Sequence, residues 1–146
     1  KFENQLLNLE KSEIVETPTL ETFDIAKRIE DNLASKHGGV VWNKIFRRKF
    51  LIENEIKFPA ITVTEDHIFS TIALSCAKNY VRIPFIGHHY RRRSDSSTNK
   101  KNSIENRLFD LIEGVYFFDN ALQKQKFFIE NPSISYQNII DLQEWM

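Results

Sequence analysis

The sequence has little of the residues that mark several common classes of protein. Its single cysteine, Cys76, cannot form an internal disulfide, so a reducing, cytoplasmic setting is expected. No apolar run approaches the roughly 20 residues of a membrane-spanning helix. The four glycines form neither G-x-G-x-x-G nor G-x-x-x-x-G-K-[ST], so both standard phosphate-cradling loops are absent. Any nucleotide contact must therefore come from side chains or from residues outside this chain.

What the sequence does contain suffices for one folded unit. The chain has 146 residues, of which 41% are hydrophobic and 12% aromatic, enough for a packed core. No internal repeat or low-complexity stretch divides it, so residues 1–146 are expected to form a single unit. Its start, Lys1-Phe2-Glu3-Asn4, is neither an initiator methionine nor a signal peptide. We therefore expect the chain to be part of a longer protein.

Charge is distributed unevenly along the chain. The 20 basic and 20 acidic residues cancel, which taken whole argues against a partner of one charge sign. Residues 1–31, however, carry 4 basic and 8 acidic groups, residues 32–101 carry 13 and 5, and residues 102–146 carry 3 and 7. The middle of the chain is thus strongly positive between two acidic flanks.

Spacing of apolar residues predicts an α+β fold in which helices predominate. Thr17-Pro18 is typical of a helix start, and the helix is expected to run to Leu33 before Gly38-Gly39. Further helices are expected over 49–54, 65–78, 103–128 and 136–145. The helix over 65–78 is expected to have Thr64 as its N-terminal cap and to end at Asn79 in a left-handed backbone conformation. Strands, or extended segments, are expected over 40–46 and 80–91, the second limited to an edge or strand end by Pro84. In the long helix the buried face is expected to hold Leu108, Leu111, Ile112, Val115, Phe118 and Leu122.

Glu65 and Asp66 are the first candidate for chemistry. A pair of carboxylates at the start of a helix suits a general base, because one can accept a proton while the other holds a hydrogen bond or a cation. The same pair also fits a purely structural role, since acidic residues in a first turn stabilise the helix dipole by about 0.3–1 kcal/mol each. Taken alone, the dipeptide favours the structural role.

A second candidate is the run His88-His89-Tyr90-Arg91-Arg92-Arg93. In an extended chain each face would receive a histidine and at least one guanidinium, and arginine suits bidentate phosphate recognition. A charged edge strand and a nucleic-acid-binding patch fit these residues equally well. The two adjacent histidines point to opposite faces, so a metal site is not expected there. Trp42, near Lys44 and Arg47, could line a sugar-binding surface or serve as a core anchor.

In order along the chain, these pieces form a recognisable series. The series consists of four segments, which are Trp42-Asn43-Lys44-Ile45-Phe46-Arg47-Arg48-Lys49-Phe50-Leu51, Ile56-Lys57-Phe58, Glu65-Asp66-His67-Ile68-Phe69, and Tyr90-Arg91-Arg92-Arg93 with Ser96-Ser97-Thr98. The series resembles the C-terminal, acceptor-side half of bacterial family 2 glycosyltransferases, which are inverting enzymes of the A-type fold. The likeness covers residues 12–102 as the acceptor-side part of a catalytic domain, with residues 103–146 as a C-terminal helical extension.

The resemblance implies a role for each candidate. Asp66 matches the general base that deprotonates the acceptor hydroxyl, and Glu65 would orient the acceptor or the loop. Trp42, Lys44 and Arg47 match a stretch that lines the acceptor side. The substrate-binding set is completed by residues near a loop that closes over the donor diphosphate, namely His89, Tyr90, Arg91 and Arg93.

The resemblance also implies parts that this sequence lacks. The family's N-terminal half binds the nucleotide sugar and holds Mg²⁺ or Mn²⁺ through an Asp-x-Asp motif, and no two aspartates here are separated by one residue. The Gln-x-x-Arg-Trp motif of processive synthases is absent too, which favours an enzyme that adds single sugars.

The expected function is therefore transfer of a sugar, with inversion, from a nucleotide-sugar donor to a glycan or lipid-linked acceptor. The enzyme would be a longer, cytoplasmic parent protein at the inner face of the cell membrane, and the isolated chain is expected to be inactive. Nucleic acid is not a partner under this reading, and self-association is expected from the strand at 40–46 and the long helix. The alternative is a non-catalytic basic module that binds a polyanion or nucleic acid.

Overall fold

The structure is a computed structural model that describes residues 15–33, 40–62, 64–85, 87–88 and 104–134. It contains the helices α1 (Ile25–Leu33), α2 (Arg48–Glu53), α3 (Glu65–Cys76), α4 (Ile104–Leu122) and α5 (Lys126–Glu130), and the strands β1 (Thr19–Leu20) and β2 (Val81–Arg82). The described part is therefore α+β and helix-dominated, as the sequence predicts. None of its helices is long and apolar enough to cross a membrane.

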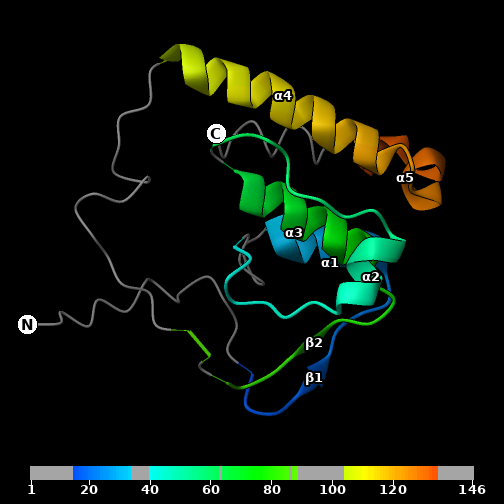
Figure 1. The fold of residues 1–146 in the computed structure, drawn as a ribbon. Helices are drawn as coiled ribbons and strands as arrows, with labels where there is room; N and C mark the ends of the chain where they lie inside the picture. The colour runs from blue at the N-terminus through cyan, green and yellow to red at the C-terminus, as the bar shows by residue number, and fades with distance from the viewer. Residues whose placement is uncertain (1–14, 34–39, 63, 86, 89–103, 135–146) are drawn as a thin grey trace, which may run out of the picture.

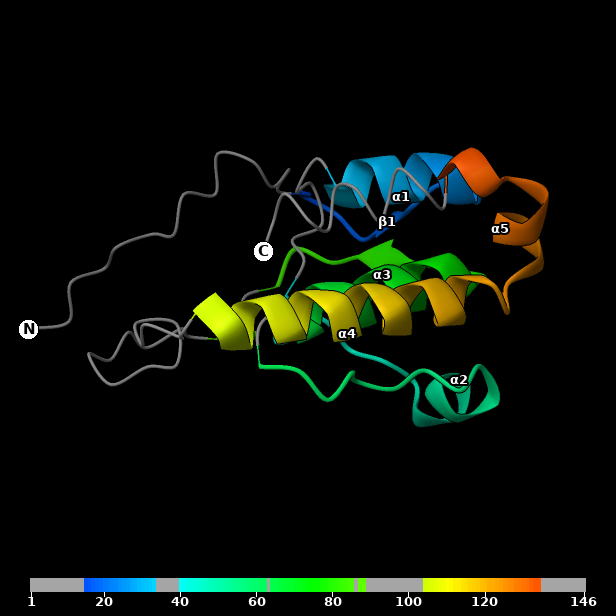
Figure 2. The same ribbon diagram turned by 90° about the horizontal axis from the view of Figure 1, so that it is seen from above.

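Helix α3 is the centre of the molecule. It lies between α1 and α4, and Figures 1 and 2 show it enclosed from both sides. Every residue from His67 to Ser75 is buried, so this helix has no solvent-facing stripe. The core around it consists of Ile29, Ile56, Ile68, Phe69, Ile72, Ala73, Phe118, Leu122 and Phe128.

Helix α1 begins later than the sequence predicts. Asp24 caps it, because the Asp24 Oδ1 atom accepts the backbone N–H of Lys27 at 3.2 Å. The expected start at Thr17-Pro18 is wrong, since Thr19 and Leu20 instead pair with Arg82 and Val81 in an antiparallel ribbon. Leu20 and Phe23 therefore precede the helix, and they are 54% and 64% exposed.

The two expected strands are largely absent from the described residues. Residues 40–46 form no strand; they make a turn at Val41–Asn43, closed by the N–H of Lys44 on the Val41 carbonyl at 3.0 Å, and then an extended approach to α2. Strand β2 ends at Arg82, ahead of Pro84, which cannot donate to a ladder. Residues 86 and 89–91 of the second expected strand lie outside the described residues.

The ends of α2 and α3 are formed differently. Glu55 follows α2 with φ 52°, and the N–H groups of Glu55 and Ile56 return to the carbonyls of Ile52 and Leu51, which is a Schellman motif. Helix α3 ends two residues before its expected limit at an extended Ala77. Asn79 is not left-handed, so the predicted stop there is wrong.

The C-terminal helical region is broken where one helix is predicted. Helix α4 ends at Leu122 and α5 starts at Lys126. Leu122 and Phe128 are both almost fully buried, yet six residues of continuous helix would put them about 120° apart around the axis. The turn between the helices lets both side chains enter the same core. The expected helix over 136–145 lies outside the described residues.

The buried face of α4 is also rotated from the predicted one. Asp110, Gly114, Phe118 and Leu122 follow at intervals of four and are buried, whereas Leu108 and Ile112 are 55% and 59% exposed. A Cβ atom on Gly114 would lie 3.1 Å from Ile61 Cδ1 and 3.3 Å from Ile68 Cδ1. Glycine therefore permits the close approach of α4 to α3 and to the loop before it.

Candidate functional site

The predicted base, Asp66, lies in the first turn of α3 beside the turn at Val41–Asn43. Its Oδ2 atom accepts the backbone N–H of Val41 at 3.4 Å, and both Glu65 and Asp66 are half-buried. A T-shaped contact between Phe46 and Phe69, with ring centroids 5.3 Å apart, fixes the same loop further along α3. The structure thus brings together Glu65, Asp66 and the segment that contains Trp42 and Lys44.

The residue ahead of the carboxylates has an unusual backbone. Thr64 has φ 63° and ψ 2°, in the left-handed region, and its side chain makes no capping hydrogen bond to α3. Thr64 therefore takes the predicted N-cap position, but its side chain does not cap the helix. A β-branched residue in this region is strained, so the surrounding contacts must hold the backbone there.

One of those contacts comes from α4. The buried Asp110 carboxylate accepts the backbone N–H of Thr62 at 3.1 Å, and the Thr62 hydroxyl donates to the same oxygen. The loop that delivers Glu65 and Asp66 is thus tied to a helix that follows 48 residues later. Asp110 was not among the predicted site residues; the available signal was its position four residues ahead of Gly114 and eight ahead of Phe118.

Lys44 directly follows the turn at Val41–Asn43, and its side chain folds back onto it. Its Nζ atom donates to the Val40 carbonyl at 2.7 Å and to Asn43 Oδ1 at 2.9 Å. Burial lowers the pKa of Lys44 to about 8, and the nearby Asp66 carboxylate opposes that shift. These bonds brace the backbone beside Asp66, and the predicted contact of Lys44 with a substrate stays a prediction.

Glu65 has a different electrostatic setting from that of Lys44. Burial raises the pKa of Glu65, its own backbone N–H partly offsets this, and the Asp66 and Asp110 carboxylates raise it further. A raised pKa makes a carboxylate a better proton acceptor at neutral pH. The pair at the start of α3 therefore contains one carboxylate held by a backbone donor and one made more basic by its surroundings.

The remaining predicted residues are placed less fully. Arg47 is exposed directly before α2. His89, Tyr90, Arg91 and Arg93 lie outside the described residues, so all three interpretations of that run stay open. The neighbouring His88 belongs to the same run but not to the predicted substrate-binding set, and it packs its ring on Trp42 with centroids 4.9 Å apart and planes at 32°.

A metal site does not fit the described residues. They contain no group of three or more His, Cys, Asp or Glu side chains placed to hold an ion, and the sequence has no Asp-x-Asp pair. The Mg²⁺ or Mn²⁺ that the family resemblance implies would need ligands from beyond this described part.

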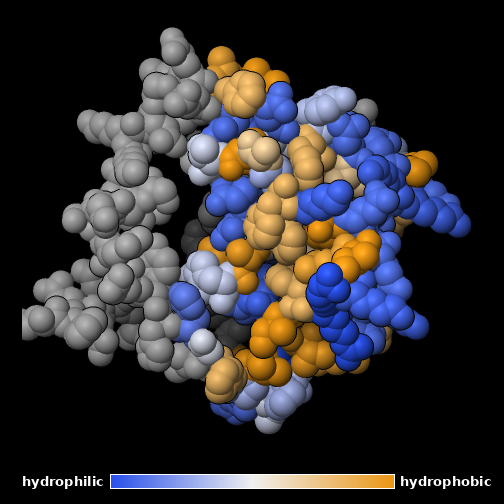
Figure 3. Space-filling view, in the orientation of Figure 1, coloured by the Kyte–Doolittle hydropathy of each residue, from blue (hydrophilic) through white to orange (hydrophobic). Residues whose placement is uncertain are grey.

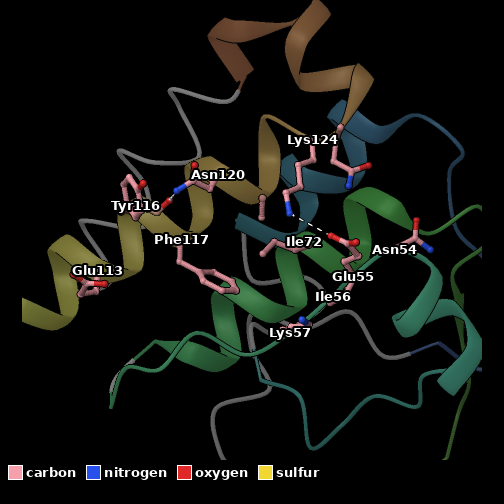
Figure 4. A pocket seen from close by; sticks show the side chains of 12 residues that line it. Asn54, Glu55, Ile56, Lys57, Ile72, Glu113, Tyr116, Phe117, Asn120 and Lys124 are labelled. Carbon is pink, nitrogen blue, oxygen red and sulfur yellow. Dashed lines mark hydrogen bonds and ion pairs between the residues drawn. The ribbon is translucent and has the colours of Figure 1, made fainter.

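A cavity of about 350 Å³ lies elsewhere, between α4 and the segment that connects α2 to α3 (Figure 4). Ile56, Ile72 and Phe117 form apolar walls, and an ion pair between Lys124 Nζ and Glu55 Oε2 at 3.3 Å crosses its rim. None of the predicted site residues lines it. Charges of both signs alternate around this hollow, so it shows no preference for a cationic or an anionic ligand.

Comparisons with protein-family models, with curated proteins and with solved structures find no match to this chain.

Proposed function

We propose that this chain is the acceptor-side part of a sugar-nucleotide-dependent glycosyltransferase that works with inversion on a glycan or lipid-linked acceptor. The donor-binding residues and any metal ligands would come from a further part of the enzyme. Cytoplasmic action at the inner membrane face belongs to the same proposal, because lipid-linked acceptors reside there.

The observation that carries the proposal is the setting of Asp66. A half-buried carboxylate at a helix start is held by the Val41 amide, next to a braced turn that presents the Trp42 side chain to solvent. A general base needs a fixed position within hydrogen-bond reach of its substrate. The alternative, a helix-dipole role alone, requires neither the loop contact nor the strained Thr64.

In the proposed reaction, Asp66 accepts the proton of an acceptor hydroxyl while that oxygen forms a bond to the anomeric carbon of the donor sugar. The bond between this carbon and the diphosphate oxygen breaks on the opposite side, and its electron pair leaves with the nucleoside diphosphate. Configuration at the anomeric carbon is thereby inverted. Glu65, whose pKa is raised, would hold a second hydroxyl of the acceptor and orient it.

The test is the Asp66→Asn substitution in the full-length enzyme, assayed by transfer of labelled sugar from a panel of nucleotide sugars. Loss of the base is expected to lower kcat by about 10²- to 10⁴-fold, with donor binding and the midpoint of thermal unfolding little changed. Glu65→Gln should cost less, and Glu53→Gln on the exposed side of α2 serves as the matched control. Unchanged turnover in Asp66→Asn would refute the assignment.

A further inference from the structure

Trp42 and His88 form a pair of packed rings on the surface of the protein. Their ring centroids are 4.9 Å apart with the planes tilted by 32°. Trp42 comes from the turn ahead of α2 and His88 from the segment after β2. Although the rings support each other, Trp42 keeps 38% of its surface exposed and His88 is exposed as well. A large rigid indole is thus fixed in place while part of it still faces solvent.

The ring pair has a defined relation to the carboxylates of α3. Trp42 directly follows Val41, whose N–H donates to Asp66 Oδ2 at 3.4 Å. The turn is closed by the Lys44 N–H on the Val41 carbonyl at 3.0 Å and braced by the Lys44 ammonium on the Val40 carbonyl at 2.7 Å. The backbone that carries the indole is therefore braced within the turn by the two Lys44 bonds and joined to Asp66 by the longer Val41 bond.

This arrangement matches the chemistry of a sugar ring. A pyranose presents C–H groups on one face and hydroxyl groups around its edge. The C–H groups carry partial positive charge and suit the electron-rich face of an indole, while the hydroxyls suit carboxylate acceptors such as Asp66 and Glu65. A phosphate placed here would instead face two carboxylates, and a flexible polyprenyl tail would leave their acceptor capacity unused.

We propose that Trp42 and His88 form one wall of an acceptor subsite in which a sugar ring stacks on the indole and directs a hydroxyl toward Asp66. The acceptor hydroxyl then belongs to a sugar and not to a polyprenyl phosphate. His88 is a positioning residue that holds the Trp42 ring. The sugar site rests on the ring pair, and its catalytic use rests on the proposed function.

The experiment is an NMR titration of the 146-residue chain with a panel of methyl pyranosides, following the indole N–H of Trp42, which Trp42→Phe identifies. The backbone N–H signals of Val41 and Lys44, in the same turn, report binding in the variants that lack the indole. At least one pyranoside should shift this signal. Trp42→Ala should weaken its binding by about three- to tenfold, the amount expected for loss of a ring contact. His88→Ala should weaken it less, and His88→Phe should restore it, which a role limited to loop folding does not predict.

Phe109→Ala removes an exposed aromatic ring from α4 and should leave pyranoside binding unchanged. The sugar site is refuted if no pyranoside shifts the Trp42 signal, if Trp42→Ala binds as well as the parent chain, or if polyprenyl phosphate in micelles competes for the site. Pyranoside binding at Trp42 combined with full turnover in Asp66→Asn would support the sugar site and overturn the proposed reaction. The reverse pair of results would overturn the sugar site and leave the reaction supported.

Discussion

At the scale of single residues, two left-handed positions decide how the chain turns. Glu55 occupies the position that a Schellman motif usually gives to glycine, and its side chain gains an exposed ion pair with Lys124. Such exposed pairs contribute about 0–1 kcal/mol, similar to the cost of a left-handed non-glycine residue. Thr64 occupies the other position, directly ahead of the predicted catalytic pair.

Glu55→Gly should therefore raise the free energy of unfolding, or leave it unchanged, because glycine adopts this backbone without strain. Glu53→Gly, two residues earlier and inside α2, should lower it by about 0.5–1 kcal/mol. Urea unfolding of the two variants measures the difference. If both substitutions destabilise the chain equally, the left-handed conformation at Glu55 is not present in solution.

The half-buried Lys44 should make stability depend on pH. Its pKa is about 8 in the folded chain and ordinarily 10.5, so between these values the unfolded chain binds more protons than the folded one. The free energy of unfolding of the parent chain relative to Lys44→Met should therefore rise from about pH 8 to 10.5. Measuring both proteins cancels the opposite contributions of Cys76 and Tyr80, whose pKa values burial raises. A flat difference across this range would contradict the burial of the ammonium.

At the scale of elements, one buried arginine connects α1 to the end of α3. Arg28 is 1% exposed and donates to the carbonyls of Thr22, Leu74 and Ala77. Two of these carbonyls belong to the C-terminal end of α3, where the dipole favours a cation. Arg28 thereby supplies the stop that the sequence analysis assigned to Asn79.

Replacing Arg28 with methionine should lower the free energy of unfolding by about 2–4 kcal/mol, because one buried and two partly buried carbonyls lose their donor. Arg48→Met on exposed α2 should stay within about 0.5 kcal/mol of the parent chain. Chemical denaturation followed by circular dichroism measures both. Equal effects of the two substitutions would show that the Arg28 network contributes little.

Local signals predicted α2 and α3 well and the segment ahead of α2 poorly. The acidic pair in the first turn marks the start of α3 regardless of its environment. At 40–46, by contrast, the strand propensity of Val41 and Phe46 is overridden by contacts with Asp66 and Phe69. The site was predictable to the extent that its residues form an ordered series. The contacts of Asp110 with Thr62 and of His88 with Trp42 join distant segments, and no local pattern encodes them.

At the scale of the whole molecule, the surface combines charged and apolar areas. Figure 3 shows apolar side chains gathered in a band on one face, bordered by hydrophilic ones. Helix α4 exposes Leu108, Phe109, Ile112 and Tyr116. In the positive middle of the chain, Lys44 and Arg82 are already engaged within the fold, Arg82 with Glu21. Fewer charges are thus available for a polyanion than the sequence suggests.

Self-association stays a prediction and now depends on α4, because the strand at 40–46 that first motivated it does not form. Sedimentation velocity at high concentration should show species larger than a monomer. Combining Leu108→Glu with Ile112→Lys should shift the distribution toward monomer, since charged residues oppose burial of this face. Ile52→Lys, on exposed α2, is the control. A monomer at every concentration would exclude association through α4.

The bond between Thr62 and Asp110 has a consequence for synthesis of the chain. Because a ribosome releases the sequence from its N-terminus, the loop ahead of Glu65 and Asp66 emerges well before its anchor on α4, 48 residues later. Until α4 folds back, nothing ties that loop to Asp110. A nascent chain that stops short of α4 would therefore carry the Glu65-Asp66 motif without the bonds that tie its loop to Asp110.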